Sequence, residues 1–147
     1  MPTPVRESVK PANDAGVQLR LLIVDDNDVY RAGMVRAADA HPGIDLVAEA
    51  DGGVAALDAI ARHQPDVALV DLRMPAVDGV AVCLAVAAME PQVATRVVIL
   101  SAATEAGVHD TALSAGAVAF LTKDLPRKEI LGMVLALVDR ESAAARS

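Results

Sequence analysis

Short, nearly continuous apolar runs alternate along the chain with segments in which apolar residues recur at helical spacing. Such runs predict buried strands, and the spacing between them predicts amphipathic helices. Strands are expected at Leu19–Val24, Ile44–Ala50, Val67–Val70, Arg96–Leu100 and Ala119–Thr122. Helices are expected at about Val29–Ala40, Val54–Ala61, Val80–Met89 and Glu105–Ser114, with a last one from Pro126 onward. The pattern therefore predicts five β–α units.

The strand pattern also predicts how these units assemble. Strands that are apolar at nearly every position are typical of a parallel sheet buried on both faces. Helices must then cover both faces, and the connections between parallel strands are right-handed. We expect a doubly wound α/β domain of the (βα)5 type, with any ligand site outside the carboxyl ends of the strands.

Composition narrows the class of protein. The chain has 147 residues, of which 54% are hydrophobic, and this fits one domain with an ordinary core. Its net charge of -7 argues against nucleic-acid binding by this segment, because phosphate contacts need clustered basic residues. The acidic balance leaves room for a small cation. The single cysteine, Cys83, excludes an internal disulfide and is expected to be a small core residue.

The two ends of the chain differ in composition from its middle. No apolar run reaches the length of about 18 residues that a membrane span needs. Residues 1–18 carry prolines and mixed charges and lack the apolar segment of a signal peptide, which indicates a flexible N-terminal arm and a cytoplasmic protein. The domain is expected at residues 19–141, and residues 142–147 have the composition of a linker.

Polar residues close four of the five predicted strands. Asp25 and Asp26 follow the first strand, Asp71 the third, Ser101 the fourth and Lys123 the fifth. Because the carboxyl ends of parallel strands meet at one edge of a sheet, these side chains are expected to lie together. Three carboxylates in one place repel each other unless a cation neutralises them.

Two cations could neutralise this cluster. Carboxylate oxygens are ligands that suit Mg2+, and Lys123 would supply a fixed positive charge. A carboxylate between a metal ion and a lysine is suited to attack a phosphoryl group, since both cations stabilise charge on its oxygens. Ser101 could then donate a hydrogen bond to a phosphoryl oxygen.

Each of these residues also has a purely structural explanation. Asp26 or Asn27 could cap the next helix, Ser101 could cap another, and Lys123 could be a solvated loop residue. Asp78-Gly79 most simply forms a turn and a helix cap. No metal role is expected for the three histidines, which show no ligand spacing: His41, His63 and His109. The coincidence of five polar residues at these strand ends favours a shared site.

Together these residues resemble the receiver domain of bacterial two-component response regulators. The matching segments are residues 21–26 (LLIVDD), 70–75 (VDLRMP) with Asp78-Gly79, 98–102 (VILSA) and 116–123 (GAVAFLTK). They occur in the family's order over about residues 19–140. The resemblance implies a flavodoxin-like fold whose five-stranded parallel sheet has the order 2-1-3-4-5.

The resemblance also implies a role for the acidic residues. Asp71 would accept a phosphoryl group from a sensor histidine kinase. Mg2+ would be bound by Asp26 directly, by Asp25 largely through water, and by the backbone carbonyl of Arg73. The chain would then be a phosphoacceptor signalling domain, with phosphotransfer and autodephosphorylation but no enzymatic turnover of a separate substrate.

The remaining site residues would sense the phosphoryl group. Ser101 and Lys123 would contact it, and the aromatic Phe120 would turn inward together with Ser101. This movement would alter the face formed by the fourth strand, the helix after it, the fifth strand and the last helix. That face is the candidate for homodimerisation or for contact with an output domain.

Two segments resemble the NarL/FixJ (LuxR-type) subfamily in particular, namely residues 71–75 (DLRMP) and 121–124 (LTKD). Lys123 is followed by Asp124, where many other receivers have proline. Members of this subfamily usually carry a helix-turn-helix DNA-binding domain after the last helix. The resemblance therefore implies transcription regulation through a C-terminal domain that is missing here; a stand-alone receiver acting through protein partners is the alternative.

Two other functions share part of the pattern. A haloacid-dehalogenase-like phosphatase also uses an Asp nucleophile and Mg2+, and Asp26-Asn27-Asp28 has its two-carboxylate spacing. However, Tyr30 stands where that family has Thr or Val, and the chain is short for it. A pseudo-receiver that works without phosphorylation typically lacks part of the acidic cluster or its lysine, and all of these residues are present here.

Overall fold

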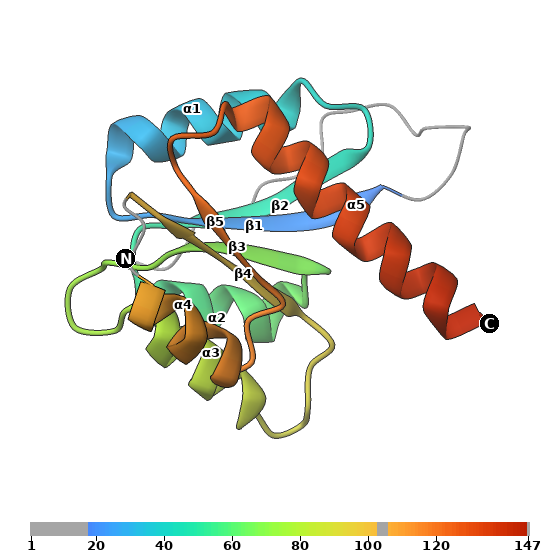
Figure 1. The fold of residues 1–147 in the computed structure, drawn as a ribbon. Helices are drawn as coiled ribbons and strands as arrows, with labels where there is room; N and C mark the ends of the chain where they lie inside the picture. Colours follow the sequence, from blue (N-terminus) through green and yellow to red (C-terminus); the bar gives the residue numbers. More distant parts are fainter. Residues whose placement is uncertain (1–17, 103–105, 147) are drawn as a thin grey trace.

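The computed structural model describes residues 18–102 and 106–146, which form five successive β–α units (Figure 1). The strands are β1 (Leu19–Val24), β2 (Ile44–Ala50), β3 (Val67–Asp71), β4 (Arg96–Ser101) and β5 (Ala119–Thr122). The helices are α1 (Asp28–Asp39), α2 (Gly53–His63), α3 (Gly79–Ala87), α4 (Ala106–Ser114) and α5 (Arg127–Arg146). Every predicted element is present within a few residues of its expected bounds.

Some of the predicted segments lie partly or wholly outside the residues that the structure describes. Apart from Gln18, the expected flexible arm lies outside them, and so does Glu105, where the fourth helix was expected to begin. Helix α5 continues to Arg146, so the residues expected to start a linker are helical up to that point. The division of the chain into arm, domain and linker remains a prediction. In the described ranges no helix is both long and apolar enough to cross a membrane.

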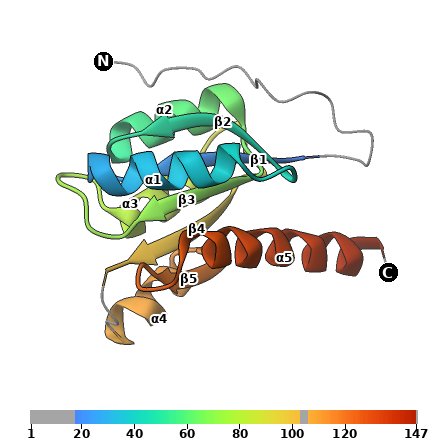
Figure 2. The same ribbon diagram turned by 90° about the horizontal axis from the view of Figure 1, so that it is seen from above.

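The sheet is parallel throughout and has the order β2-β1-β3-β4-β5, which confirms the predicted flavodoxin-like arrangement. Figure 2 shows the succession of strands from β2 at one edge to β5 at the other. Helices α1 and α5 cover one face, and α2, α3 and α4 cover the other (Figure 1). The chain thus buries both faces of the sheet, as the apolar strands require.

Alternating residues of the strands fill two separate cores. Leu22 and Val70 belong to the core beneath α2, α3 and α4. Their neighbours Leu21 and Leu69 belong to the core beneath α1 and α5. Successive side chains of a strand point to opposite faces, so each strand contributes to both cores. Cys83 is buried in the first core, as expected for a small apolar residue.

Close packing brings the start of α3 against the end of β3. A Cβ added to Gly79 would lie 2.9 Å from the carbonyl oxygen of Asp71 and 3.1 Å from Leu72 Cα, so a larger residue would push the helix away. At the amino end of the edge strand β5, Gly116 has φ +115° and turns the chain from α4 into that strand. The close contact of Gly79 with Asp71 and Leu72 helps set the position of the carboxyl end of the central strand β3.

Candidate functional site

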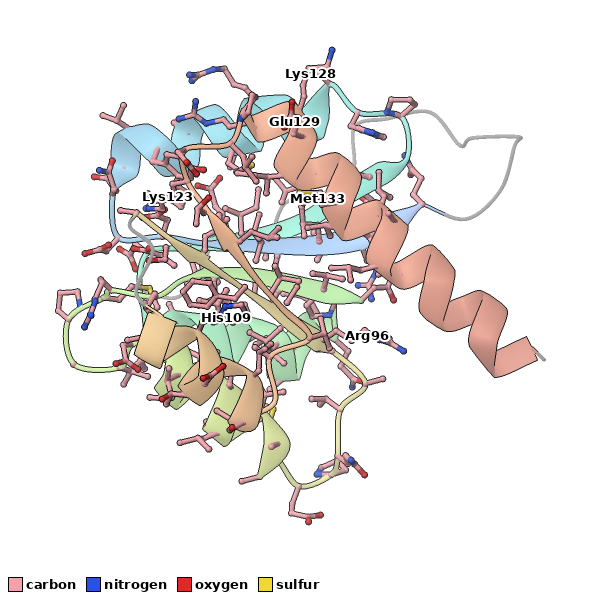
Figure 3. The ribbon with its side chains drawn as sticks, viewed as in Figure 1. Arg96, His109, Lys123, Lys128, Glu129 and Met133 are labelled. Atoms are coloured by element: carbon pink, nitrogen blue, oxygen red, sulfur yellow. The ribbon has the colours of Figure 1, made fainter. Side chains whose placement is uncertain are left out.

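The carboxyl edge of the sheet gathers the polar residues that the sequence singled out. Asp25 follows β1, Asp71 ends β3 and Ser101 ends β4; these residues are only 1%, 6% and 2% exposed. Asp26 is exposed beside Asp25. One carboxylate oxygen from each of the three aspartates lies within 4.8 Å of the other two. Lys123 follows β5 at the same edge (Figure 3).

Lys123 joins the strands electrostatically. Its Nζ donates a hydrogen bond of 2.7 Å to Asp25 Oδ2 and lies 3.3 Å from Asp71 Oδ1. Its backbone N–H donates to the carbonyl oxygen of Ser101 at 2.8 Å. One residue therefore contacts the ends of β1, β3 and β4 while following β5.

Local hydrogen bonds fix the orientation of Asp25. The backbone N–H of Asn27 donates to Asp25 Oδ1 at 2.8 Å. The Asn27 side chain accepts from the backbone N–H of Tyr30 at 2.9 Å, so Asn27 caps α1 and Asp26 does not. Arg31 Nη1 donates to the carbonyl oxygen of Asp25 at 2.6 Å. The loop after β1 is thus fixed by hydrogen bonds to both the side chain and the backbone carbonyl of Asp25.

Arg31 is a residue of the site that the sequence pattern alone does not single out. Its guanidinium pairs with Glu49 on β2 at 3.1 Å and with Asp28 at 2.8 Å, in addition to the Asp25 carbonyl. Glu49, an acidic residue in the mostly apolar strand β2, was a sequence signal of a cationic partner. Asp28 is therefore paired with Arg31 and is not part of the acidic cluster, whose third carboxylate comes from Asp71. This arrangement disfavours a haloacid-dehalogenase-like phosphatase, which would use Asp26 and Asp28 together.

The loop after β3 is fixed by the start of α3. Asp78 caps this helix, accepting from the backbone N–H of Ala81 at 2.9 Å, which confirms its structural role. The N–H of Gly79 donates to the carbonyl oxygen of Leu72 at 2.9 Å. Arg73 lies in this loop with an exposed side chain, and the role of its backbone carbonyl as a metal ligand remains a prediction.

The electrostatics of the cluster follow from burial and crowding. Burial and the neighbouring charge of Asp25 raise the pKa of Asp71 from 3.8 to about 6, although Lys123 opposes the shift. Burial lowers the pKa of Lys123, but the hydrogen bond to Asp25 and the charge of Asp71 outweigh it and leave that pKa raised. The lysine is therefore charged at neutral pH, whereas the carboxylates remain under-neutralised by this single cation.

This donor set fits a hard divalent cation. All three potential ligands are carboxylate oxygens, and two of the carboxylates are buried. Among the described residues, the one group of acidic, histidine or cysteine side chains with metal-ligand spacing is Asp25, Asp26 and Asp71. The raised pKa of Asp71 indicates that the site would gain from another positive charge.

The predicted switch residue has an unexpected partner. Phe120 is partly buried in β5, and its ring stacks on His109 of α4 with a centroid distance of 5.1 Å and an interplanar angle of 18°. Figure 3 shows His109 between α4 and the sheet. No metal role is expected for His109 from its sequence spacing, and its contact with Phe120 is visible only in the tertiary structure.

Comparison with known proteins identifies the family. The chain matches the family model of the response regulator receiver domain over residues 21–135. It therefore belongs to the response regulator receiver domain family, and both its strand order and its acidic cluster are those of a two-component signalling receiver.

Individual relatives narrow the likeness to NarL. The transcriptional regulatory protein NarL of Mycobacterium tuberculosis H37Rv is 43% identical over 124 residues, which are 84% of this chain and 56% of that protein. The solved signal receiver domain of NarL from Mycobacterium tuberculosis superposes with a TM-score of 0.78 at 43% identity and covers 82% of this chain and 96% of that chain. The chain is thus a NarL-like receiver domain.

Receivers of this kind also occur in other proteins. A protein-glutamate methylesterase/protein-glutamine glutaminase of Xanthomonas euvesicatoria pv. vesicatoria is 37% identical over 128 residues, which are 86% of this chain and 35% of that protein. The chain therefore spans a little over half of NarL and about a third of the methylesterase. The relatives that contain this matched region are named for different functions.

Proposed function

We propose that the chain is a Mg2+-dependent phosphoacceptor in which Asp71 receives a phosphoryl group from a phosphohistidine of a sensor histidine kinase. The observation that carries the proposal is the position of Lys123 Nζ, which contacts both Asp25 and Asp71 where three carboxylates converge. A carboxylate held beside a fixed cation and a metal site is suited to attack phosphorus.

The chemistry is a transfer between two acceptors. An oxygen of Asp71 attacks phosphorus, the P–N bond to the kinase histidine breaks, and the departing imidazole keeps the electron pair. The product is an acyl phosphate on Asp71. Lys123 neutralises charge on the phosphoryl oxygens, and Ser101 donates a hydrogen bond to one of them.

The acidic residues would hold the metal ion. Asp26 would bind Mg2+ directly, Asp25 largely through water, and the backbone carbonyl of Arg73 would add a further oxygen. The bound ion would supply further positive charge to the carboxylates of the cluster. Asp26→Ala is expected to abolish the effect of added Mg2+ on the thermal unfolding temperature, because it removes the exposed carboxylate of the cluster.

A small phosphodonor tests the acceptor directly. Incubation with acetyl phosphate and Mg2+ should add one phosphoryl group to the wild type and none to Asp71→Asn, as measured by intact-mass spectrometry. Asp58→Asn is the matched control, since Asp58 pairs with Arg62 on the surface of α2, and it should be labelled like the wild type. A labelled Asp71→Asn or an unlabelled wild type would contradict the proposal.

Phosphorylation would alter the face formed by β4, α4, β5 and α5. Ser101 would move toward the phosphoryl group, and Phe120 would turn into the space behind β4, leaving its stack on His109. Hydrogen exchange with and without beryllofluoride, a phosphoryl mimic, should therefore change across residues 106–137. Changes confined to the loops after Asp25 and Asp71 would refute this route.

The proposed outcome is transcription regulation through a further domain. NarL, whose receiver is 43% identical to this chain, is named as a transcriptional regulatory protein and is longer than the matched region. We infer a DNA-binding output domain controlled by the altered face, directly or through dimerisation. Sequencing the gene beyond codon 147 tests this inference: a helix-turn-helix domain would support it, whereas a methylesterase domain or a stop codon would contradict it.

A further inference from the structure

The ring of Tyr30, in the first turn of α1, contacts two cations from the far end of the chain. Lys123 Nζ lies 4.3 Å from the ring centroid, and Arg127 Cζ lies 4.5 Å from it. Lys123 follows β5 and Arg127 begins α5, so the ring touches both ends of the loop between these elements. An aromatic face attracts cations electrostatically, and the attraction is stronger where water is excluded.

The first turns of α1 hold both the ring and Arg127. The backbone N–H of Tyr30 is fixed by the side chain of Asn27. One turn later, a Cβ on Gly33 would lie 2.7 Å from Arg127 Cζ, so the guanidinium packs directly against the helix backbone. A larger residue at position 33 would displace Arg127 from the ring. The planar guanidinium is well suited to stacking on an aromatic face.

This contact uses the face of the ring and not its hydroxyl group. Tyr30 Oη is buried without a hydrogen-bond partner, and so is Nε of Arg127. Neither atom takes part in a hydrogen bond, so hydrogen bonding does not explain why these two side chains meet. Burying the two unpaired polar atoms is in fact unfavourable. The attraction of two cations to one ring does explain it.

We propose that Tyr30 is a positioning residue for Lys123, whose ammonium group its ring face holds at the carboxylates of Asp25 and Asp71. The inference rests on the proposed function, in which Asp71 is the phosphoacceptor. A lysine side chain is a flexible stem with a point charge, and the ring restricts the directions that this charge can take. Arg127 ties the same ring to the start of α5, so a movement of Lys123 toward a phosphoryl oxygen also alters the contact that holds α5.

Two substitutions of Tyr30 separate the ring face from its other properties. Tyr30→Phe keeps the face and removes a hydroxyl group that has no partner, whereas Tyr30→Leu keeps an apolar side chain and removes the face. Phosphorylation by acetyl phosphate is followed at saturating Mg2+ over a range of donor concentrations. Mg2+ affinity and thermal unfolding are measured on the same proteins.

We expect Tyr30→Leu to lower the maximal rate about five- to tenfold, in keeping with a contact shielded from water. Its Mg2+ affinity and its KM for the donor should stay within about twofold of wild type, because the carboxylates are intact. Tyr30→Phe should retain the wild-type rate. Equal losses in the two variants, or no loss in Tyr30→Leu, would overturn the proposal.

Arg127 provides a second test should Tyr30→Leu not fold. Arg127→Met removes the cation that holds the ring and should slow phosphorylation about two- to fivefold, whereas Arg127→Lys keeps a cation and should slow it less. Wild-type rates in both variants would overturn the proposal. Failure of the proposed function has a different signature: the wild type gains no phosphoryl group, or Asp71→Asn gains one, and both proposals then fall.

Discussion

The carboxyl edge of the sheet has two halves that are built differently. The acidic half, with Asp25, Asp26 and Asp71, lies at the carboxyl ends of β1 and β3, whose residues are buried with one exception. The switch half, with Ser101 and Phe120, belongs to β4, α4 and β5, and every residue of β5 is only partly buried. Lys123 follows β5 but forms its ion pairs with the acidic half.

This difference in packing implies a difference in mobility. Helix caps and the Arg31 hydrogen bond hold the loops of the acidic half. In α4, by contrast, Ala112 is the one buried side chain among residues 107–114. Segments with few buried apolar contacts open at a low cost in free energy. The acidic half thus holds repelling charges at fixed positions, whereas α4 and β5 in the switch half can rearrange at little cost.

The largest effect is expected from removing the charge that joins the two halves. Lys123→Met leaves the buried carboxylates of Asp25 and Asp71 without their cation. Loss of one partner from a buried ion pair costs about 3–5 kcal/mol, so the free energy of unfolding at neutral pH should fall by about 3 kcal/mol. Urea unfolding without Mg2+ measures this change, and added Mg2+ should restore part of the loss.

An exposed lysine provides the matched control for that substitution. Lys128 is the second residue of α5 and its side chain is exposed (Figure 3), so Lys128→Met should change the free energy of unfolding by less than about 0.5 kcal/mol. If Lys123→Met cost no more than this control, Lys123 would not be neutralising the acidic half.

The next largest effect on the free energy of unfolding is expected at Asp71, where a substitution should stabilise the protein and the gain should depend on pH. The pKa of Asp71 is raised from 3.8 to about 6, so between these values the folded protein holds a proton that the unfolded chain has released. The carboxyl group therefore contributes stability at pH values below about 4 and loses this contribution as pH rises through about 6. A shift of about two units corresponds to about 3 kcal/mol.

Asp71→Asn should remove this penalty. We expect its free energy of unfolding to exceed that of the wild type by up to about 3 kcal/mol at neutral pH and to match it near pH 4 or below, as urea unfolding at both pH values would show. The control Asp58→Asn, in a half-exposed pair with Arg62, should differ from wild type by less than about 1 kcal/mol. A variant less stable than wild type at neutral pH would mean that attraction to Lys123 outweighs burial and repulsion.

The smallest effect is expected in the switch half. His109→Ala removes the stack on Phe120, and since aromatic pairs contribute about 0.5–1.5 kcal/mol, this exposed histidine should contribute about 0.5 kcal/mol. Urea unfolding measures the loss, and hydrogen exchange in β5 should become faster. His63→Ala, at the end of α2, is the control. A loss above about 2 kcal/mol would mean that the switch half is packed as firmly as the acidic half.

The helices and strands could be predicted from the sequence because local patterns of residues specify them. Apolar runs such as residues 67–70 predict buried strands, and Asn27 and Gly116 punctuate the chain where helices begin and end. The convergence of Asp25 and Asp71 followed from the rule that parallel strands end at one edge. The predicted ends of α2 and α3 each differ from the observed ends by two residues, because caps and neighbouring elements decide where a helix stops.

The sequence by itself determined the strand order through its family resemblance, and it determined which residue types stand at the carboxyl edge. Only the tertiary structure decided how their charges are balanced. Lys123 and Asp25 are 98 positions apart in the sequence, and the ion pair of Arg31 with Glu49 joins α1 to β2. Burial, the raised pKa of Asp71 and the contact of Tyr30 with Lys123 all depend on distances between such remote segments. A local pattern does not encode those distances, because they are set by how helices pack on the sheet.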